Sequence, residues 1–232
     1  MAIQLYDLAG KDSDIMFSPF CWRVRMSLLH KGLNFELIPW RFAEKETIEE
    51  SGHSAVPVIK DGDKWVGDSW EIIKYLDTQY PELPTLMNGS EGRAHAQLVL
   101  ELCGSLVFPA VIPIAVYQAY EILDEASKPY FRESREAMFG TSLEQLNADP
   151  QAGKAGLVQA LKPFDALLQT SNFIGGDQPT YADYALFGIL KWADIVSSYR
   201  PIDDTSFVGR WFVRLENMYD GYAKNVPTVR NR

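Results

Sequence analysis

Three short stretches in the first third of the chain carry side chains that could bind and activate a thiol. The first is Ser18-Pro19-Phe20-Cys21, where Ser18 stands at the position that a C-x-x-C redox motif gives to its first cysteine. Ser18 suits an N-cap and Pro19 suits the first helical position, so a helix is predicted to begin here. Capping alone explains such a serine. Because free N–H groups and the helix dipole favour an anion at this place, its hydroxyl could also stabilise a ligand's thiolate.

The other two stretches offer groups that could bind an extended, peptide-like ligand bearing both an ammonium and a carboxylate. In Val56-Pro57 the proline removes a backbone donor, so it belongs at a sheet edge or at a cis peptide bond. A cis bond would turn the backbone groups of Val56 toward a peptide-like ligand. Asp68-Ser69 begins the next predicted helix, where the carboxylate could pair with an ammonium and the hydroxyl could take a carboxylate. Plain capping and a plain edge proline remain alternative interpretations.

The elements that position these residues alternate between strand and helix up to about residue 80. A hairpin follows two strands that are separated by helices, and this order predicts a mixed sheet. After a Pro- and Gly-rich stretch only helical signals remain, and Pro109 and Pro113 predict a kink or break in the first of these helices. We therefore predict a βα domain over 1–82, a linker over 83–92 and an all-helical domain over 93–232. The predicted strands are 3–8, 34–40 and a hairpin over 56–67, and the predicted helices are 19–32, 68–80, 91–123, 129–146, 152–170, 180–199 and 205–223.

Composition and charge argue against several classes of protein. A net charge of −9 over 232 residues does not suit a nucleic-acid partner, which needs a basic face. Two cysteines and three scattered histidines suit neither a disulfide framework nor a metal site. The longest apolar run, 106–116, is shorter than the roughly 20 residues of a membrane helix and holds two prolines. The first residues have no secretory pattern, so we predict a cytoplasmic protein without a membrane partner.

Ser18, Val56-Pro57 and Asp68-Ser69, in this order, resemble the glutathione transferase superfamily, and the resemblance covers essentially the whole chain. It implies a thioredoxin-like N-terminal domain with a mixed four-stranded sheet and an all-α C-terminal domain. The stretch 173–190 is similar to the family's buried capping box, with Thr180 as the cap and Asp183 three residues later. At the subfamily level the chain is most similar to serine-type bacterial β-etherase-like transferases and their fungal relatives. Omega-like transferases carry Cys at the position of Ser18.

The resemblance implies a detoxification-type or aryl-ether-cleaving transferase that uses glutathione as co-substrate, holds no metal and forms a homodimer. Ser18 would stabilise the glutathione thiolate for attack on a hydrophobic electrophile, and Val56, beside Pro57, would pair with the cysteinyl backbone. Asp68 and Ser69 would hold the γ-glutamyl end. The cation for the glycine carboxylate stays open among Arg41, Lys45 and His53. The predicted walls of the second-substrate pocket are Phe17, Phe20, Phe108, Ile112, Tyr117 and Trp192.

Three alternatives remain from the sequence. The first is a thiol oxidoreductase that uses Cys21, although Cys21 shares an apolar helical stripe with Val24 and Leu28 and is predicted to lie in the core. The second is a glutathione-binding or protein-interaction module without catalysis. The third is a glutathione-dependent isomerase, dehalogenase or peroxidase. Arg23 and Arg25 are predicted to be structural ion-pair partners.

Overall fold

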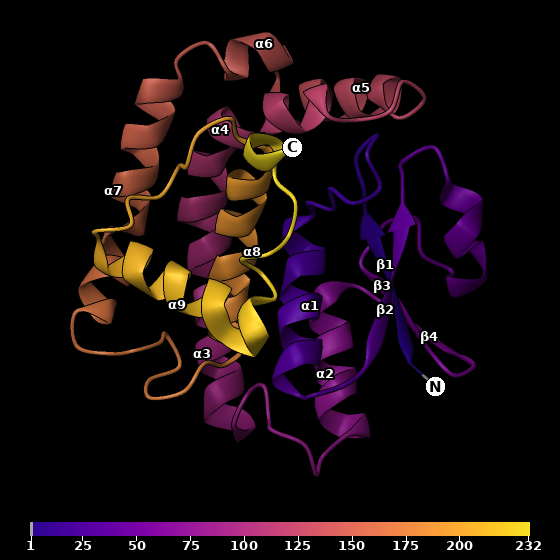
Figure 1. Cartoon of the computed structure of the whole chain (residues 1–232), viewed down its shortest axis with the longest axis vertical. Helices are drawn as coiled ribbons and strands as arrows, with labels where there is room; N and C mark the ends of the chain where they lie inside the picture. Colours follow the sequence, from indigo (N-terminus) through magenta and orange to yellow (C-terminus); the bar gives the residue numbers. More distant parts are fainter. Residues whose placement is uncertain (1) are drawn as a thin grey trace.

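The computed structural model describes residues 2–232, apart from the side chain of residue 150, and shows a sheet domain beside a helical domain (Figure 1). The sheet has the strand order β2-β1-β3-β4. β1 pairs in parallel with β2 and antiparallel with β3, so the predicted mixed four-stranded sheet is confirmed. Pro39 lies in the edge strand β2, where a missing backbone donor is tolerated. The strands are β1 (Ile3–Leu8), β2 (Phe35–Trp40), β3 (Val58–Asp61) and β4 (Lys64–Gly67).

Helix α1 (Pro19–His30) lies between the sheet and the helical domain, and this place explains its burial (Figure 1). Nine of its residues are buried, including Arg25, which forms an ion pair of 2.6 Å with the buried Asp7 of β1. A short 3₁₀ helix, η1 (Lys45–Ser51), precedes the hairpin of β3 and β4, and helix α2 (Ser69–Gln79) follows this hairpin.

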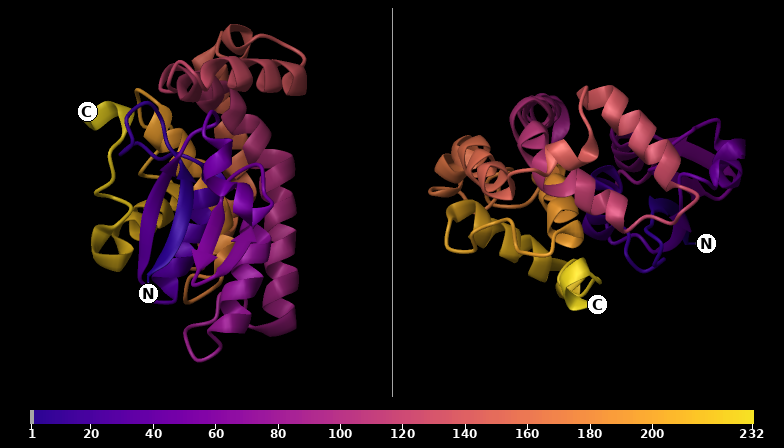
Figure 2. Two further views of the ribbon diagram at one scale, coloured as in Figure 1. Left: turned by 90° about the vertical axis from the view of Figure 1, so that its right-hand side faces the viewer. Right: turned by 90° about the horizontal axis from the view of Figure 1, so that it is seen from above.

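The helical domain begins at Gly89, so the first helical turn overlaps the predicted linker 83–92. The predicted helix over 129–146 is two helices, because Gly140 ends the first at a φ of 68° and Ser142 caps the second. Figures 1 and 2 show α5 reaching from the helical domain over the sheet domain. The elements are α3 (Gly89–Leu102), η2 (Cys103–Val107), α4 (Phe108–Glu121), α5 (Lys128–Phe139), α6 (Leu143–Leu146), α7 (Pro150–Leu168), α8 (Tyr181–Val196), α9 (Phe207–Gly221) and η3 (Val229–Asn231).

The segment Gly89–Glu121 is one continuous helix of 33 residues. Of the predicted kink or break, the break does not occur: the helix is disrupted locally by η2, a π-helical segment just before Pro109, and Pro113 lies inside α4. A π turn is one way for a helix to accommodate a disrupted hydrogen-bond ladder. The most apolar window of the helix Gly89–Glu121 has a mean hydropathy of 2.1. By length and composition this helix could cross a membrane, whereas the apolar run 106–116 alone was judged too short. Buried core helices pass the same test, and 44% of this window is buried.

Helix α8 forms the centre of the molecule, with every one of its residues buried. As the predicted capping box requires, the Asp183 carboxylate accepts the backbone N–H of Thr180, at 2.9 Å. It also accepts three further donors: the N–H groups of Ile174 and Gly175 and the indole of Trp211, at 2.7–2.9 Å. A carboxylate with four donors is well compensated for its burial.

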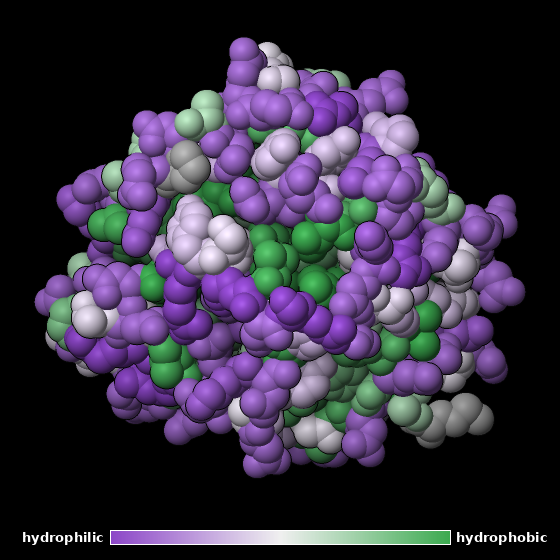
Figure 3. All heavy atoms as spheres, turned by 45° about the horizontal axis from the view of Figure 1, so that its top comes forward, coloured by the Kyte–Doolittle hydropathy of each residue, from purple (hydrophilic) through white to green (hydrophobic). Residues whose placement is uncertain are grey.

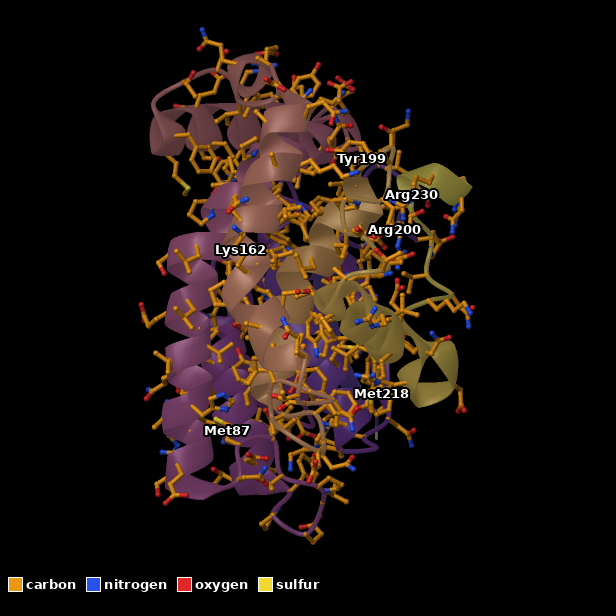
Figure 4. The ribbon with its side chains drawn as sticks, turned by 90° about the vertical axis from the view of Figure 1, so that its left-hand side faces the viewer. Met87, Lys162, Tyr199, Arg200, Met218 and Arg230 are labelled. Atoms are coloured by element: carbon orange, nitrogen blue, oxygen red, sulfur yellow. The ribbon has the colours of Figure 1, made fainter. Side chains whose placement is uncertain are left out.

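The carboxyl end of α8 is held by a network of ion pairs with α9 and the last residues of the chain. Buried Lys191 pairs with Asp194 at 3.0 Å and with Glu216 of α9 at 2.7 Å. Arg200 and Arg230 complete the network by pairing with Glu216 and Asp194, and Figure 4 shows both arginines on this side of the molecule. Every charge in it has a partner, so the network is explained as structure.

Candidate active site

Ser18 is the N-cap of α1, and its buried hydroxyl oxygen accepts the N–H of Cys21 at 3.3 Å. This hydrogen bond uses the oxygen as acceptor and leaves the hydroxyl proton to be donated. Ser18 lies on the wall of a cavity, next to the backbone N–H of Phe20 in the first turn of the helix, since Pro19 has no N–H and that of Cys21 is bound by Ser18. The hydroxyl and the helix N-terminus therefore act on the same place, and both favour an anion there.

The peptide bond between Val56 and Pro57 is cis, which is one of the two conformations that the sequence allows. Val56 and Pro57 line a pocket together with Asp68 and Ser69. We call it the polar pocket; its volume is about 300 Å³ and it is lined by Phe20, His53, Ser54, Ala55, Val56, Pro57, Asp68 and Ser69. The structure thus brings together the four residues that are predicted to bind the ligand backbone and its γ-glutamyl end.

A second pocket, the apolar cavity, adjoins the polar pocket because Phe20, Ala55 and Val56 line both. Its volume is about 350 Å³, within the range of small-molecule sites. Figure 3 shows a face of the molecule on which apolar atoms gather in a hollow among hydrophilic ones. Four of the predicted pocket residues line the cavity, Phe17, Phe20, Phe108 and Trp192. The rings of Phe108 and Trp192 stack at 5.6 Å.

Ile112 and Tyr117, the other two predicted pocket residues, are not among the described residues that line the apolar cavity; from α4 the cavity is lined by Phe108, Val116 and Ala119. Tyr117 lies nine residues after Phe108, two and a half helical turns, and thus on the opposite side of α4. Its ring packs against Tyr120 instead.

Sequence reasoning missed the contribution of α5 to the cavity, which comes from Phe131, Arg135, Met138 and Phe139. The spacing i, i+4, i+7 and i+8 of these residues is a helical stripe, and this signal could have indicated a shared face. Phe42, just after β2, also lines the cavity from the sheet domain, and its ring lies 5.7 Å from that of Phe131.

Of the three cations considered for the glycine carboxylate, the structure disfavours Arg41. Its guanidinium donates to the carbonyl of Gly10, to Glu44 and to Ser13, at 2.7–3.1 Å, so it ties the loop after β1 to the end of β2. Lys45 and His53 line an outer pocket that shares His53 and Ser54 with the polar pocket. These two cations are therefore the better placed.

Cys21 lies in the core, as predicted, and is fully buried. Burial, together with the neighbouring Asp7 carboxylate, raises the pKa of the Cys21 thiol well above its usual value. Burial also raises the pKa of the Cys103 thiol to about 12. Since the thiolate is the nucleophile of thiol chemistry, neither cysteine suits a thiol oxidoreductase. Arg23 and Arg25 were both predicted to be structural ion-pair partners. Arg25 forms an ion pair with Asp7, whereas the Arg23 guanidinium lies 4.8 Å from the centre of the Phe20 ring.

A cis-proline sheet domain that presents a helix N-terminus to an adjoining helical domain defines the thioredoxin-like transferase class of folds. Two family models match this chain, the N-terminal domain of glutathione S-transferase over residues 13–90 and its C-terminal domain over residues 94–205. The chain belongs to the glutathione S-transferase superfamily.

Three relatives show how far the similarity extends. The glutathione S-transferase-like protein ustS of Aspergillus flavus is 29% identical over 140 residues, 54% of this chain and 49% of that protein, so the match spans about half of its length. The crystal structure of glutathione transferase GSTFuA3 from Phanerochaete chrysosporium is 25% identical with a TM-score of 0.77, covering 97% of this chain and 94% of that one. A glutathione S-transferase of Ceriporiopsis subvermispora in complex with glutathione is 23% identical with a TM-score of 0.78, covering 96% and 95% of the two chains.

Proposed function

We propose that this chain is a glutathione transferase that activates the glutathione thiol beside Ser18 and directs it at an electrophile in the apolar cavity. One observation carries the proposal: Ser18 caps α1 on the wall of an apolar cavity that shares Val56 with the polar pocket. A tripeptide in the polar pocket would then have its sulfur at the helix N-terminus and its target next to it. Binding of glutathione by a structural relative of the same fold supports this assignment.

The polar pocket suits glutathione group by group. Asp68 would pair with the γ-glutamyl ammonium, while the hydroxyl and backbone N–H of Ser69, at the start of α2, would take the neighbouring carboxylate. The backbone of Val56 would pair with the cysteinyl residue in the manner of an added strand. Lys45 or His53 would face the glycine carboxylate from the outer pocket.

The chemistry needs only a thiolate and a held electrophile. On binding, the thiol of glutathione loses its proton to solvent, and Ser18 donates a hydrogen bond to the sulfur. A sulfur lone pair forms the new C–S bond, and the leaving group departs with the electrons of the bond that breaks. Holding both reactants in adjoining pockets supplies the proximity.

The test is a pH titration of protein-bound glutathione by the ultraviolet absorbance of its thiolate. In the wild type we expect ionisation well below the free pKa, and Ser18→Ala should raise the bound pKa by about 1–2 units, the value of one charge-assisted hydrogen bond. Ser206→Ala is the matched control, because Ser206 caps α9 through Gly209 at 2.9 Å and lines none of the three pockets.

The outcomes separate the alternatives. If the pKa of bound glutathione is lowered but Ser18→Ala does not change it, the backbone N–H groups of the helix N-terminus, and not the hydroxyl, stabilise the thiolate. Absence of a thiolate at neutral pH would contradict the transferase and favour a glutathione-binding module.

The finer parts of the proposal are an aryl-ether substrate, a homodimer and a cytoplasmic location. The first rests on the resemblance of the Ser18 stretch to etherase-like transferases. With an aryl β-ether the leaving group would be a phenolate, which takes up a proton from water. A substrate panel of aryl ethers, aryl halides, hydroperoxides and maleyl isomers distinguishes this reaction from the dehalogenase, peroxidase and isomerase alternatives.

A further inference from the structure

Arg135 of α5 is the only charged side chain among the described residues that line the apolar cavity. The other described residues of the lining are apolar except for Ser18, which has a hydroxyl group. A guanidinium among such walls loses part of its hydration, and an uncompensated charge in an apolar place is costly. Its presence there therefore needs a reason beyond packing.

Aromatic faces hold the guanidinium in place without using its hydrogen-bond donors. Its central carbon lies 4.7 Å from the centre of the Phe131 ring and 5.5 Å from that of Phe42. Such cation–π contacts compensate the charge in part and fix its position. Burial lowers the pKa of Arg135, which agrees with this partial desolvation.

The donors of Arg135 are largely unused. Nη1 donates to Ser134 Oγ at 2.8 Å, and no carboxylate of the described residues pairs with the guanidinium. A guanidinium has five N–H donors in a planar fork that matches a carboxylate.

Arg132, one turn earlier on the same helix, shows the contrast. Its guanidinium pairs with Glu136 and Glu144, each at 2.7 Å, and lies outside the cavity lining. The pairing makes Arg132 a structural residue of α5 and α6. Arg135 has the same side chain on the same helix, but it faces the cavity instead of a carboxylate.

We propose that the second substrate is an aromatic electrophile bearing a carboxylate, and that Arg135 binds this carboxylate and determines the specificity. The aromatic walls accept the ring, the guanidinium fork fixes the acid group, and the reacting carbon is left to face Ser18. The inference rests on the proposed function, since it takes the reaction with glutathione as given.

The experiment compares two electrophiles that differ at one substituent, a charged carboxylate in 4-chloro-3-nitrobenzoate and a neutral amide of similar shape in 4-chloro-3-nitrobenzamide. In both reactions the glutathione sulfur forms a C–S bond and chloride leaves with the electrons of the C–Cl bond. Arg135→Gln should raise KM for the benzoate about 10- to 100-fold, the effect of hydrogen bonds to a charged group, and change KM for the benzamide less than about 3-fold. Arg132→Gln should leave the ratio of the two KM values unchanged.

Equal losses for both substrates in Arg135→Gln, or wild-type KM values without any preference for the benzoate, would overturn the proposal. The failure of the proposed function looks different, because then neither compound is conjugated. For that case, binding of the unreactive 3-nitrobenzoate and 3-nitrobenzamide is measured by calorimetry. Selective binding of the benzoate that Arg135→Gln abolishes supports the role of Arg135, and equal binding of both compounds refutes it.

Discussion

At the scale of the single residue, Asp68 combines a helix cap with an unusual backbone. Its φ of 67° lies in the left-handed region, which is uncommon for residues other than glycine and gathers at ligand sites. Its Oδ1 accepts the N–H groups of Trp70 and Glu71 at 2.9 and 3.2 Å. Both bonds end on one oxygen, which leaves Oδ2 for a cationic group in the polar pocket.

Asp68→Asn tests this division of roles. Asparagine caps helices as well as aspartate and tolerates the left-handed region, so the fold should be unchanged. The lost charge should raise KM for glutathione about 10-fold with kcat nearly constant, as measured by steady-state kinetics. Asp149→Asn is the control, since Asp149 caps α7 through Ala152 at 2.9 Å and lines none of the three pockets. A fall in kcat at constant KM would contradict the binding role.

The residue scale also shows which site residues can be read from a sequence. Ser18 and Asp68 were accessible because their positions as caps depend on neighbours in the chain, whereas Val56-Pro57 stayed open between a cis bond and an edge proline until the structure showed the cis bond. Arg41 was not accessible, because its partners Gly10 and Ser13 come from a loop about thirty residues earlier. Long-range pairing of this kind has no local signal.

At the scale of the element, caps made the helix starts predictable. Ser18, Asp68 and Thr180 are N-caps in the structure, and the helices begin where these residues place them. The split at Gly140 was missed, since a glycine in a polar helix leaves the apolar pattern intact. Pro109 and Pro113 predicted a disruption of the first long helix, but not that it would be a π segment inside a continuous helix.

The start of α8 depends on the carboxylate of Asp183, which accepts four hydrogen bonds. Asp183→Asn keeps the shape, but an amide offers one acceptor oxygen to four donors and turns its NH₂ toward two of them. The free energy of unfolding should fall by about 3 kcal/mol or more, measured from the urea midpoint. Ser206→Ala removes the part-buried cap bond to the N–H of Gly209 and the hydrogen bond that Ser206 donates to the carbonyl of Asp203, and it should cost about 1 kcal/mol. Equal losses in the two variants would show that the Asp183 network is not special.

At the scale of the whole molecule, the apolar cavity exists only because two domains meet. Phe17 and Phe42 come from the sheet domain, while Phe108, Arg135 and Trp192 come from three helices of the other. Four of the six predicted wall residues line this cavity, and their role toward a substrate stays a prediction. The identity of the charged wall residue depends on how α5 crosses the sheet domain, which helical periodicity does not determine.

The two domains approach each other closely where Gly188 of α8 passes the first turn of α1. A Cβ atom on Gly188 would overlap the carbonyl oxygen of Pro19, next to Ser18. Gly188→Ala should therefore move the helix N-terminus away from the cavity, lowering the free energy of unfolding by about 1–3 kcal/mol and kcat/KM with it.

Gly156→Ala on α7 is the matched control for the close contact at Gly188, because beyond the adjoining residues and backbone of α7 no atom lies within 4 Å of the added Cβ. There the higher helix propensity of alanine should stabilise the protein by about 1 kcal/mol and leave kcat/KM unchanged. Urea unfolding and steady-state kinetics of both variants measure the difference. If Gly188→Ala behaved like Gly156→Ala, the packing of α8 on α1 would not control the position of Ser18, and the two domains would be coupled elsewhere.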